Sequence, residues 1–286
     1  MFRNHKTNVI AKNNIRHYSY VLDHDTGYAP NPFWGCMTLA TCKPCLEKKG
    51  GFRSFARKDS WIVGTGGSKL YLERFEYYNG KLKDISPEKN INNKRLVFAF
   101  KVGEVVDTFE KYFNDPRFEC KKISLNENEP IKRSGDNHLS DRGEGSNPIK
   151  YNNNNPLDSG KEKFAWVESV LVSNVNNFYY FGCFAPVLPE KLRAIINKGR
   201  NCKKFDNDKA ELLEAFLLNV TGGKKGIFGF PSFKNEKRYR EEANDVLYLK
   251  AIYNEYLKGV VSDKELRKLI ECKEMKNSSL RKIFEG

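Results

Sequence analysis

The chain has 286 residues, and its 50 Lys and Arg against 36 Asp and Glu give a formal net charge of +14. Aromatic residues make up 13% of it, which argues against intrinsic disorder, because disordered chains contain few aromatics. No apolar run approaches the roughly 18 residues of a membrane-spanning helix, and the first residues are charged without an apolar core. We therefore expect neither a membrane protein nor a secreted one.

The cysteines also indicate the compartment. There are seven, an odd number and too few for a disulfide scaffold, so we expect reduced thiols in a cytoplasmic protein. Cys36, Cys42 and Cys45 lie close together, but a structural zinc site needs four ligands, and the other cysteines are single and distant. We expect no metal and no cofactor.

The positive charge is spread along the chain rather than gathered in one tail. Such an excess favours a polyanionic partner, here DNA or a nucleotide, over a membrane or a neutral ligand. The alternative explanation is a proteome that is rich in Lys and Asn, which the Asn-rich segments of this chain also suggest.

The first half of the chain is predicted to form three strands. Residues 17–23 alternate aromatic and β-branched side chains, and residues 59–68 form an apolar strand that ends in a glycine turn. Between these two strands, residues 24–33 make a loop with two prolines and a glycine. Residues 96–106 are the clearest strand, and residues 107–110 are typical of a helix start.

The second half begins with a long polar segment at 120–162, which is unusual inside a compact domain unless it is functional or mobile. Strand character returns at 164–173 and 178–184. A helix is predicted from Leu188-Pro189-Glu190 to about residue 198, before Gly199, and a second one at 209–220, where apolar residues recur at helical spacing.

Many strands with few helices between them predict an α+β protein. We expect a mostly antiparallel, barrel-like sheet with peripheral helices. Residues 1–232 would form this domain, and residues 233–286 a charged helical C-terminal appendage, in which Ser262 and Glu265 form a capping box. The strand pattern resembles the PUA-like barrels of the ASCH and EVE families, which bind nucleic acid or modified bases.

Six motifs carry a more specific resemblance, which covers residues 17–232. They are HDTGYAPNPF (24–33), TLATCKP (38–44), WIVGTG (61–66), FNDPRF (113–118), GDN (135–137) and YYFG (179–182). With them the chain resembles the type 2 branch of the nucleotide modification associated domain family. The resemblance implies an association with DNA modification and phage–host conflict (phage defence), and leaves the reaction open.

The loop after the first strand holds the candidate catalytic residues, His24 and Asp25. An imidazole with a pKa near neutrality can act as a general acid or base, and a carboxylate can take a proton or bind a base amino group. The side-chain amide of Asn31 can read a base edge, because it both donates and accepts. In the alternative interpretation the loop is structural, with Asp25 capping a turn and His24 packed inside.

A base-binding pocket is predicted around the same loop. Tyr28, Phe33 and Trp34 offer aromatic faces on which a flipped or single-stranded base can stack. Asp136 and Asn137, from the GDN motif of the family resemblance, complete the predicted base-binding set. The alternative is that these aromatics belong to the core.

A phosphate site is predicted around the glycine turn at 64–69. Glycine amides beside a lysine can cradle a phosphate, although the P-loop pattern Gly-x4-Gly-Lys-Ser/Thr is missing. An ordinary tight turn is the alternative. The predicted phosphate-binding residues are Lys43, Thr65, Gly66, Ser68, Lys69 and, in a second glycine turn, Lys224.

Three functions remain open on this basis. The first is a nucleic-acid or nucleotide binding protein that recognises a modified base in an aromatic-lined pocket. The second is an enzyme that acts on a nucleotide or a DNA base, with His24 and Asp25 as the acid–base pair. The third is an assembly module that docks a protein partner through its C-terminal helices.

Overall fold

The structure is a computed structural model, and it describes a large part of the N-terminal 231 residues. The predicted helical extension at 233–286 and most of the predicted loop at 120–162 lie outside the described residues. The described residues are 15–23, 25, 27, 29–40, 55–70, 72–86, 91–122, 136–137, 169–197, 199, 202–229 and 231.

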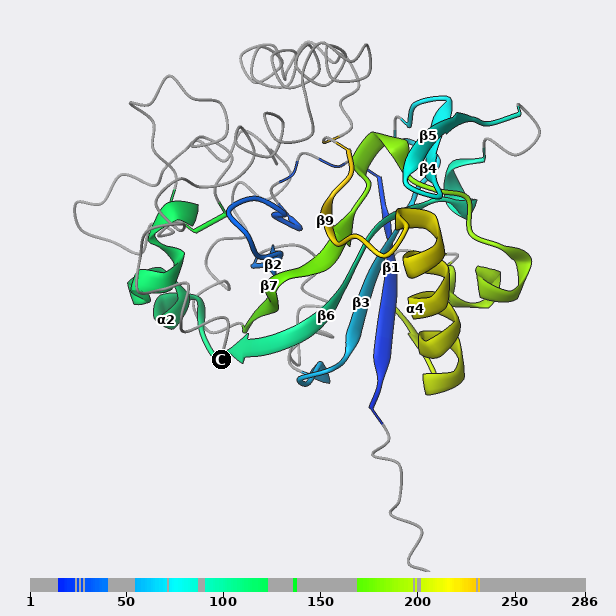
Figure 1. Cartoon of the computed structure of the whole chain (residues 1–286). Helices are drawn as coiled ribbons and strands as arrows, with labels where there is room; N and C mark the ends of the chain where they lie inside the picture. Colours follow the sequence, from blue (N-terminus) through cyan, green and yellow to red (C-terminus); the bar gives the residue numbers. More distant parts are fainter. Residues whose placement is uncertain are drawn as a thin grey trace, which may run out of the picture.

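Within these residues a seven-stranded mixed sheet forms a curled half-barrel with few helices around it (Figure 1). Its order is β2-β7-β6-β3-β1-β8, with β9 beside β7. The pairs β1–β3 and β7–β9 are parallel and the other pairs are antiparallel. The strands are β1 (His17–Leu22), β2 (Thr38–Leu39), β3 (Trp61–Gly66), β6 (Leu96–Val106), β7 (Val170–Tyr180), β8 (Lys203–Phe205) and β9 (Gly226–Ile227).

The remaining elements are short, apart from one helix. That helix, α4 (Asn207–Thr221), begins at the Asp206 cap, whose side chain accepts the N–H of Lys209. The others are the hairpin strands β4 (Phe75–Tyr78) and β5 (Lys81–Asp84), the helix α2 (Phe109–Asn114), and the 3₁₀ helices η2 (Asn92–Lys94), η3 (Pro116–Lys121), η5 (Gly182–Phe184) and η6 (Glu190–Ile195).

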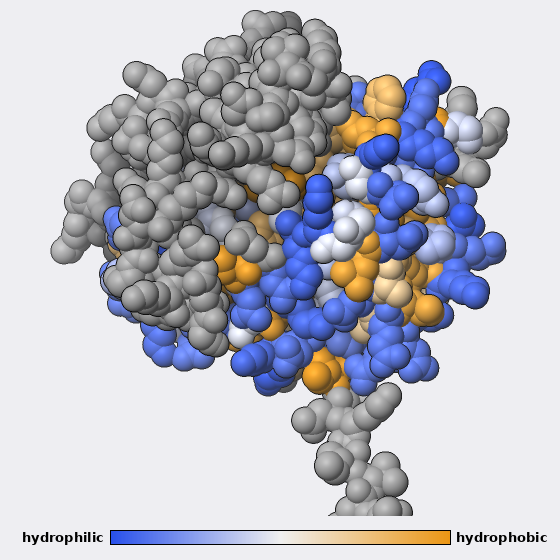
Figure 2. Space-filling model, in the orientation of Figure 1, coloured by the Kyte–Doolittle hydropathy of each residue, from blue (hydrophilic) through white to orange (hydrophobic). Residues whose placement is uncertain are grey.

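The core lies on both faces of the central strands. Phe98 and Phe100, on one face of β6, are fully buried, but so are Val97 and Ala99 on the other face. A smaller apolar cluster lies under α2, where Tyr112 packs on Phe118. The outer surface over α4 and the β4–β5 hairpin mixes hydrophilic residues with small apolar patches (Figure 2).

The predicted strands at 17–23, 59–68 and 96–106 are confirmed as β1, β3 and β6. The helix start at 107–110 is confirmed too, since Thr108 caps α2 by accepting the N–H of Lys111. These segments were predictable because their apolar periodicity and their caps are local properties of the sequence.

Two predictions differ from the structure. The described parts of the strands expected at 164–173 and 178–184 belong to one continuous strand, β7, which pairs with β6 at both ends, while residues 182–184 form η5 and residues 164–168 lie outside the described residues. The helix expected at 188–198 is the shorter 3₁₀ helix η6, after which Ile196 is extended. The carbonyl of Ile195 accepts a hydrogen bond from the buried Ser19 hydroxyl, which holds the end of η6 against β1.

The β4–β5 hairpin was missed, although the sequence contains a signal for it. Asn79 and Gly80 both have positive φ angles, 47° and 74°, as a type I′ turn requires. Asn-Gly is the most favoured pair for this turn, because the two residues adopt the left-handed conformation at low cost.

A buried histidine joins β1, β3 and α4. The Nδ1 of His17 accepts the backbone N–H of Trp61 at 3.0 Å, so its Nε2 carries the proton and donates to Asn207 at 2.8 Å. Burial lowers the pKa of His17 below its ordinary value of 6.5, which favours this neutral form. The start of α4 is thereby fixed against the sheet.

Arg95 holds the hairpin on the sheet. Its fully buried guanidinium donates to the backbone carbonyls of Ala185, Glu73 and Phe75, each at 2.7 Å. Burial lowers the pKa of Arg95 to about 10, yet the group still titrates well above neutral pH. The hairpin, η5 and the end of η2 are therefore joined through one cation.

We expect Arg95→Met to lower the free energy of unfolding by at least about 3 kcal/mol, because it leaves three carbonyls without their donor. Urea unfolding followed by fluorescence measures the loss. The matched control is Arg74→Met, which removes an exposed arginine that pairs with Asp84 on the same hairpin and should leave the unfolding midpoint unchanged. Equal, small losses in both variants would contradict the role of Arg95.

Candidate functional site

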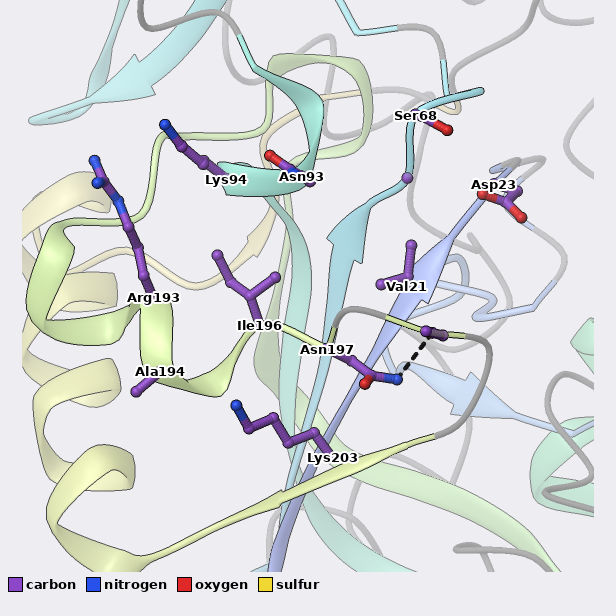
Figure 3. Close-up of a pocket in the computed structure, with 12 residues that line it drawn as sticks. Val21, Asp23, Ser68, Asn93, Lys94, Arg193, Ala194, Ile196, Asn197 and Lys203 are labelled. Atoms are coloured by element: carbon purple, nitrogen blue, oxygen red, sulfur yellow. Dashed lines mark hydrogen bonds between the residues drawn. The ribbon is translucent and has the colours of Figure 1, made fainter.

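A pocket of about 870 Å³ lies at the sheet edge where β1 and β3 end (Figure 3). Its walls come from the ends of these two strands, from η2, from η6 and the residues after it, and from β8. Pockets of this volume are typical of small-molecule sites, which measure roughly 300–1,000 Å³.

The parallel pairing of β1 with β3 creates this edge. Leu22 is paired with Gly66, so Asp23 and Gly67 follow the two strands side by side. The Gly67 N–H donates to the carbonyl of Leu22 at 2.6 Å, and a Cβ at position 67 would lie 2.4 Å from the Asp23 Oδ1. Only glycine fits here, because a Cβ would also lie 2.7 Å from the backbone carbonyl of Leu22, which the strand pairing holds in place. In open α/β sheets, ligand crevices likewise form at the carboxyl ends of parallel strands.

The pocket is positively charged. Of the described residues that line it, Lys94, Arg193 and Lys203 are cations, and Asp23 is the single acid. Within the described chain, none of the three cations has an ion pair or a side-chain hydrogen bond. Unpaired cations around a concave site attract anions, and phosphate oxygens suit both Arg and Lys.

The charges are unevenly placed. In Figure 3, Lys94 and Arg193 lie at one end of the pocket, while Asp23 and Ser68 lie at the other. Asn197 lies between them, and its amide donates to the carbonyl of Gly199 at 3.0 Å, which holds the turn after η6. The pocket thus has a cationic end and an end that accepts hydrogen bonds.

The predicted phosphate-binding residues separate in the structure. Ser68 lines the pocket. Thr65 and Gly66 are buried within β3, where Gly66 donates to the carbonyl of Arg95 at 3.0 Å. Lys69 is exposed beside the same turn, and Lys224 is exposed after α4. Lys43 lies outside the described residues.

The sequence analysis missed the cations of the pocket. Lys94 follows Asn93, Arg193 lies between Leu192 and Ala194, and Lys203 lies between Cys202 and Lys204, so the three share no sequence context. Their positions carry no local signal, because the three side chains come from segments far apart in the sequence and meet only in the fold.

Asp25 lies in the loop that follows β1 and is buried. Its Oδ2 accepts the Tyr180 hydroxyl at 2.7 Å, and its Oδ1 accepts the Gly27 N–H at 3.1 Å. Burial raises the pKa of Asp25 to about 6, although these two hydrogen bonds act in the opposite direction. His24 and Tyr28 lie outside the described residues, so the expected His24–Asp25 pair stays a prediction.

The other loop residues gather around a buried lysine, Lys121. Its Nζ donates to the Asn31 Oδ1 at 2.9 Å and to the Phe33 carbonyl at 2.8 Å, and it lies 5.6 Å from the centre of a Trp34 ring. Asn31, Phe33 and Trp34 are themselves buried. The Asn31 side chain therefore hydrogen-bonds within the protein, and the role of Lys121 was not predictable from its neighbours in the sequence.

Asp136 and Asn137 join the same cluster. The Asp136 carboxylate accepts the hydroxyls of Thr38 at 2.5 Å and Tyr112 at 2.7 Å. Burial raises the pKa of Asp136, and the nearby Lys121 opposes the rise. The Asn137 amide donates to the carbonyl of Phe118 at 3.1 Å, while its buried Oδ1 has no partner among the described residues.

The structure thus brings together five of the predicted base-binding residues, in a buried network rather than along the pocket. Their role in binding a base stays a prediction. The set is Asn31, Phe33, Trp34, Asp136 and Asn137.

The described residues hold no group of three or more His, Cys, Asp or Glu side chains placed to bind a metal. Of the three clustered cysteines, Cys36 is buried and burial raises the pKa of its thiol, while Cys42 and Cys45 lie outside the described residues. In the same part of the chain, no helix is long and apolar enough to cross a membrane.

We expect the free energy of unfolding of Asp25→Asn, relative to that of the unaltered protein, to rise as the pH increases from about 4 to about 6. The raised pKa of Asp25 means that the folded state keeps a proton that the unfolded chain loses, so this group's contribution to the free energy of unfolding falls over that range. The variant has no such loss. Its free energy of unfolding minus that of the unaltered protein should therefore increase by up to about 3 kcal/mol between pH 4 and pH 7.

Urea unfolding at both pH values measures this difference. The exposed Asp107→Asn is the control and should show the same small difference at pH 4 and pH 7. A pH-independent difference for Asp25→Asn would mean that the carboxyl titrates as it does in the unfolded chain.

Comparison with known proteins adds the family. No curated protein and no solved structure matches the chain at a significant level. The family model that describes nucleotide modification associated domain 2 matches residues 14–237, which include the pocket, the Asp25 loop and the buried cluster around Lys121. The chain therefore belongs to the nucleotide modification associated domain 2 family.

Proposed function

We propose that this protein binds a nucleotide or nucleic acid within a system of DNA base modification or phage–host conflict, and that the pocket at the ends of β1 and β3 holds a phosphate group. The observation that carries the proposal is the set of three cations around one concavity, Lys94, Arg193 and Lys203, which have no ion pair with any described residue. Membership of the family supports the association with nucleotide modification.

The net charge of the whole chain also favours binding of an anionic ligand. A net charge of +14 attracts polyanions over a distance, and the pocket then supplies defined contacts. Arg193 can offer two parallel N–H groups to a phosphate, whereas Lys94 and Lys203 act as point charges. The Ser68 hydroxyl and the amide of Asn93 add neutral hydrogen-bonding groups on the same walls.

Recognition of a modified base belongs to the same proposal. The loop that starts at Asp23 continues into the predicted base-binding residues, so a nucleotide with its phosphate in the pocket lies next to the start of that loop. The buried cluster around Lys121 holds the later part of this loop in place, because Lys121 donates hydrogen bonds to the carbonyl of Phe33 and the side chain of Asn31.

Catalysis is the second candidate, and one observation favours it. The pKa of Asp25 is raised to about 6, close to the pH at which a general acid or base works best. In this version Asp25 exchanges a proton with His24, its neighbour in the sequence. The assembly function depends on residues 233–286, which lie outside the described residues.

The pocket can be tested with two adjacent lysines of β8. Successive side chains of a strand point to opposite faces, and Lys203 lines the pocket while Lys204 does not. We expect Lys203→Glu and Arg193→Glu each to weaken binding of a fluorescein-labelled single-stranded DNA by about tenfold, the size of a lost charge-assisted contact. Lys204→Glu changes the net charge equally and should weaken binding much less.

Fluorescence anisotropy at several salt concentrations measures these affinities. The affinity of the unaltered protein should fall as salt rises, because bound phosphates release counterions, and the two pocket variants should show a shallower dependence. Equal losses in Lys203→Glu and Lys204→Glu would show that general charge, and not the pocket, binds the DNA.

A further inference from the structure

We propose that the pocket takes a single nucleotide, with its phosphate between Lys94 and Arg193 and a hydrogen-bond donor of its sugar or base on the carboxylate of Asp23. This inference rests on the proposed function and adds the form of the ligand, its direction in the pocket and a residue that determines specificity. It assigns Asp23 the role of recognising the nucleoside part.

The distribution of charge gives the direction. The cations Lys94 and Arg193 lie at the end of the pocket opposite Asp23, so a phosphate is attracted to the first end and repelled from the second (Figure 3). A nucleoside 5′-phosphate has the complementary pattern, since its charge is at one end and the hydroxyl and amino donors are at the other. Lys203 and Asn197 line the pocket between the two ends.

The state of Asp23 supports its role as an acceptor. Its side chain is exposed, and it forms no hydrogen bond or ion pair within the described chain. The carboxylate lies directly over Gly67, where a Cβ would come within 2.4 Å of its Oδ1. A glycine at this position therefore allows a free carboxylate to stand at the wall of the pocket, beside the Ser68 hydroxyl.

The same acid argues for one nucleotide, either free or at the end of a strand, over a strand that passes through the pocket. A strand that continued through the pocket would bring its next phosphate toward Asp23, and like charges at close range repel. A surface that binds single strands typically follows the backbone with a row of cations, whereas Lys94, Arg193 and Lys203 line one concavity of about 870 Å³. That volume accommodates a mononucleotide.

Variants of Asp23 test the inference, because they should weaken nucleotide binding without weakening the binding of pyrophosphate. Removing the carboxylate by Asp23→Ala, or more conservatively by Asp23→Asn, takes away a negative charge and an acceptor at the same time. We expect the variants to bind AMP at least tenfold more weakly, with dAMP affected equally where the donor is on the base, and to bind inorganic pyrophosphate as tightly as the unaltered protein or more tightly. Arg193→Ala should weaken binding of all three ligands, and Lys204→Ala should affect none.

Isothermal titration calorimetry on the full-length chain gives these affinities, and thermal unfolding checks that each variant is folded. Comparing AMP with dAMP, and dAMP with dTMP, separates a donor on the ribose from an amino group on the base. A loss that is confined to AMP assigns the 2′-hydroxyl to Asp23, and a loss for dAMP that exceeds the loss for dTMP assigns the base amino group.

The remaining outcomes overturn one claim or the other. If Asp23→Ala strengthens the binding of nucleotides and pyrophosphate alike, Asp23 is only a nearby charge, and the inference fails while the phosphate pocket stands. Binding of pyrophosphate without any binding of the nucleotides has the same meaning. If Arg193→Ala leaves pyrophosphate and nucleotide binding unchanged, the proposed phosphate pocket itself is wrong.

Discussion

The buried guanidinium of Arg95 is the contact on which the pocket depends. Each N–H donor of a buried cation needs an acceptor, because the cation is shielded from water. The hydrogen bonds to Arg95 therefore hold the carbonyls of Glu73, Phe75 and Ala185 in position. The backbone of Arg95 acts as well, because its carbonyl accepts the N–H of Gly66 at the end of β3. Arg95 directly follows η2, and η2 supplies Asn93 and Lys94 to the pocket. One wall of the pocket is thereby fixed to the strand end that supplies Ser68.

A second buried cation organises the opposite part of the molecule. Lys121 joins the loop after β1 to η3, and the Asp136 carboxylate continues the network through Thr38 and Tyr112. Segments that are separated by up to about a hundred residues in the chain meet there. Each of these segments supplies donors or acceptors to a buried network, where polar groups need hydrogen-bond partners.

The pocket and the buried network share the segment that begins at Asp23. Its first residue faces the pocket, and its later residues, from Asn31 onward, belong to the Lys121 cluster. A ligand that contacts Asp23 therefore contacts the start of a loop whose other end is anchored. This arrangement suits a binding site, since the exposed Asp23 belongs to a segment that the Lys121 cluster holds in place.

The sequence by itself determined the strands β1, β3 and β6, the start of α2, the helix α4 and the family, because apolar periodicity, caps and motifs are written in consecutive residues. The tertiary structure alone decided that β1 and β3 run parallel, that β7 is continuous, and that Lys94, Arg193 and Lys203 surround one pocket. It also turned Asn31 and Asp136, which the sequence offered as ligand contacts, toward Lys121, Thr38 and Tyr112. These features depend on which distant segments come into contact. The burial of apolar surface and the pairing of buried polar groups select those contacts, and the partners lie in different parts of the sequence.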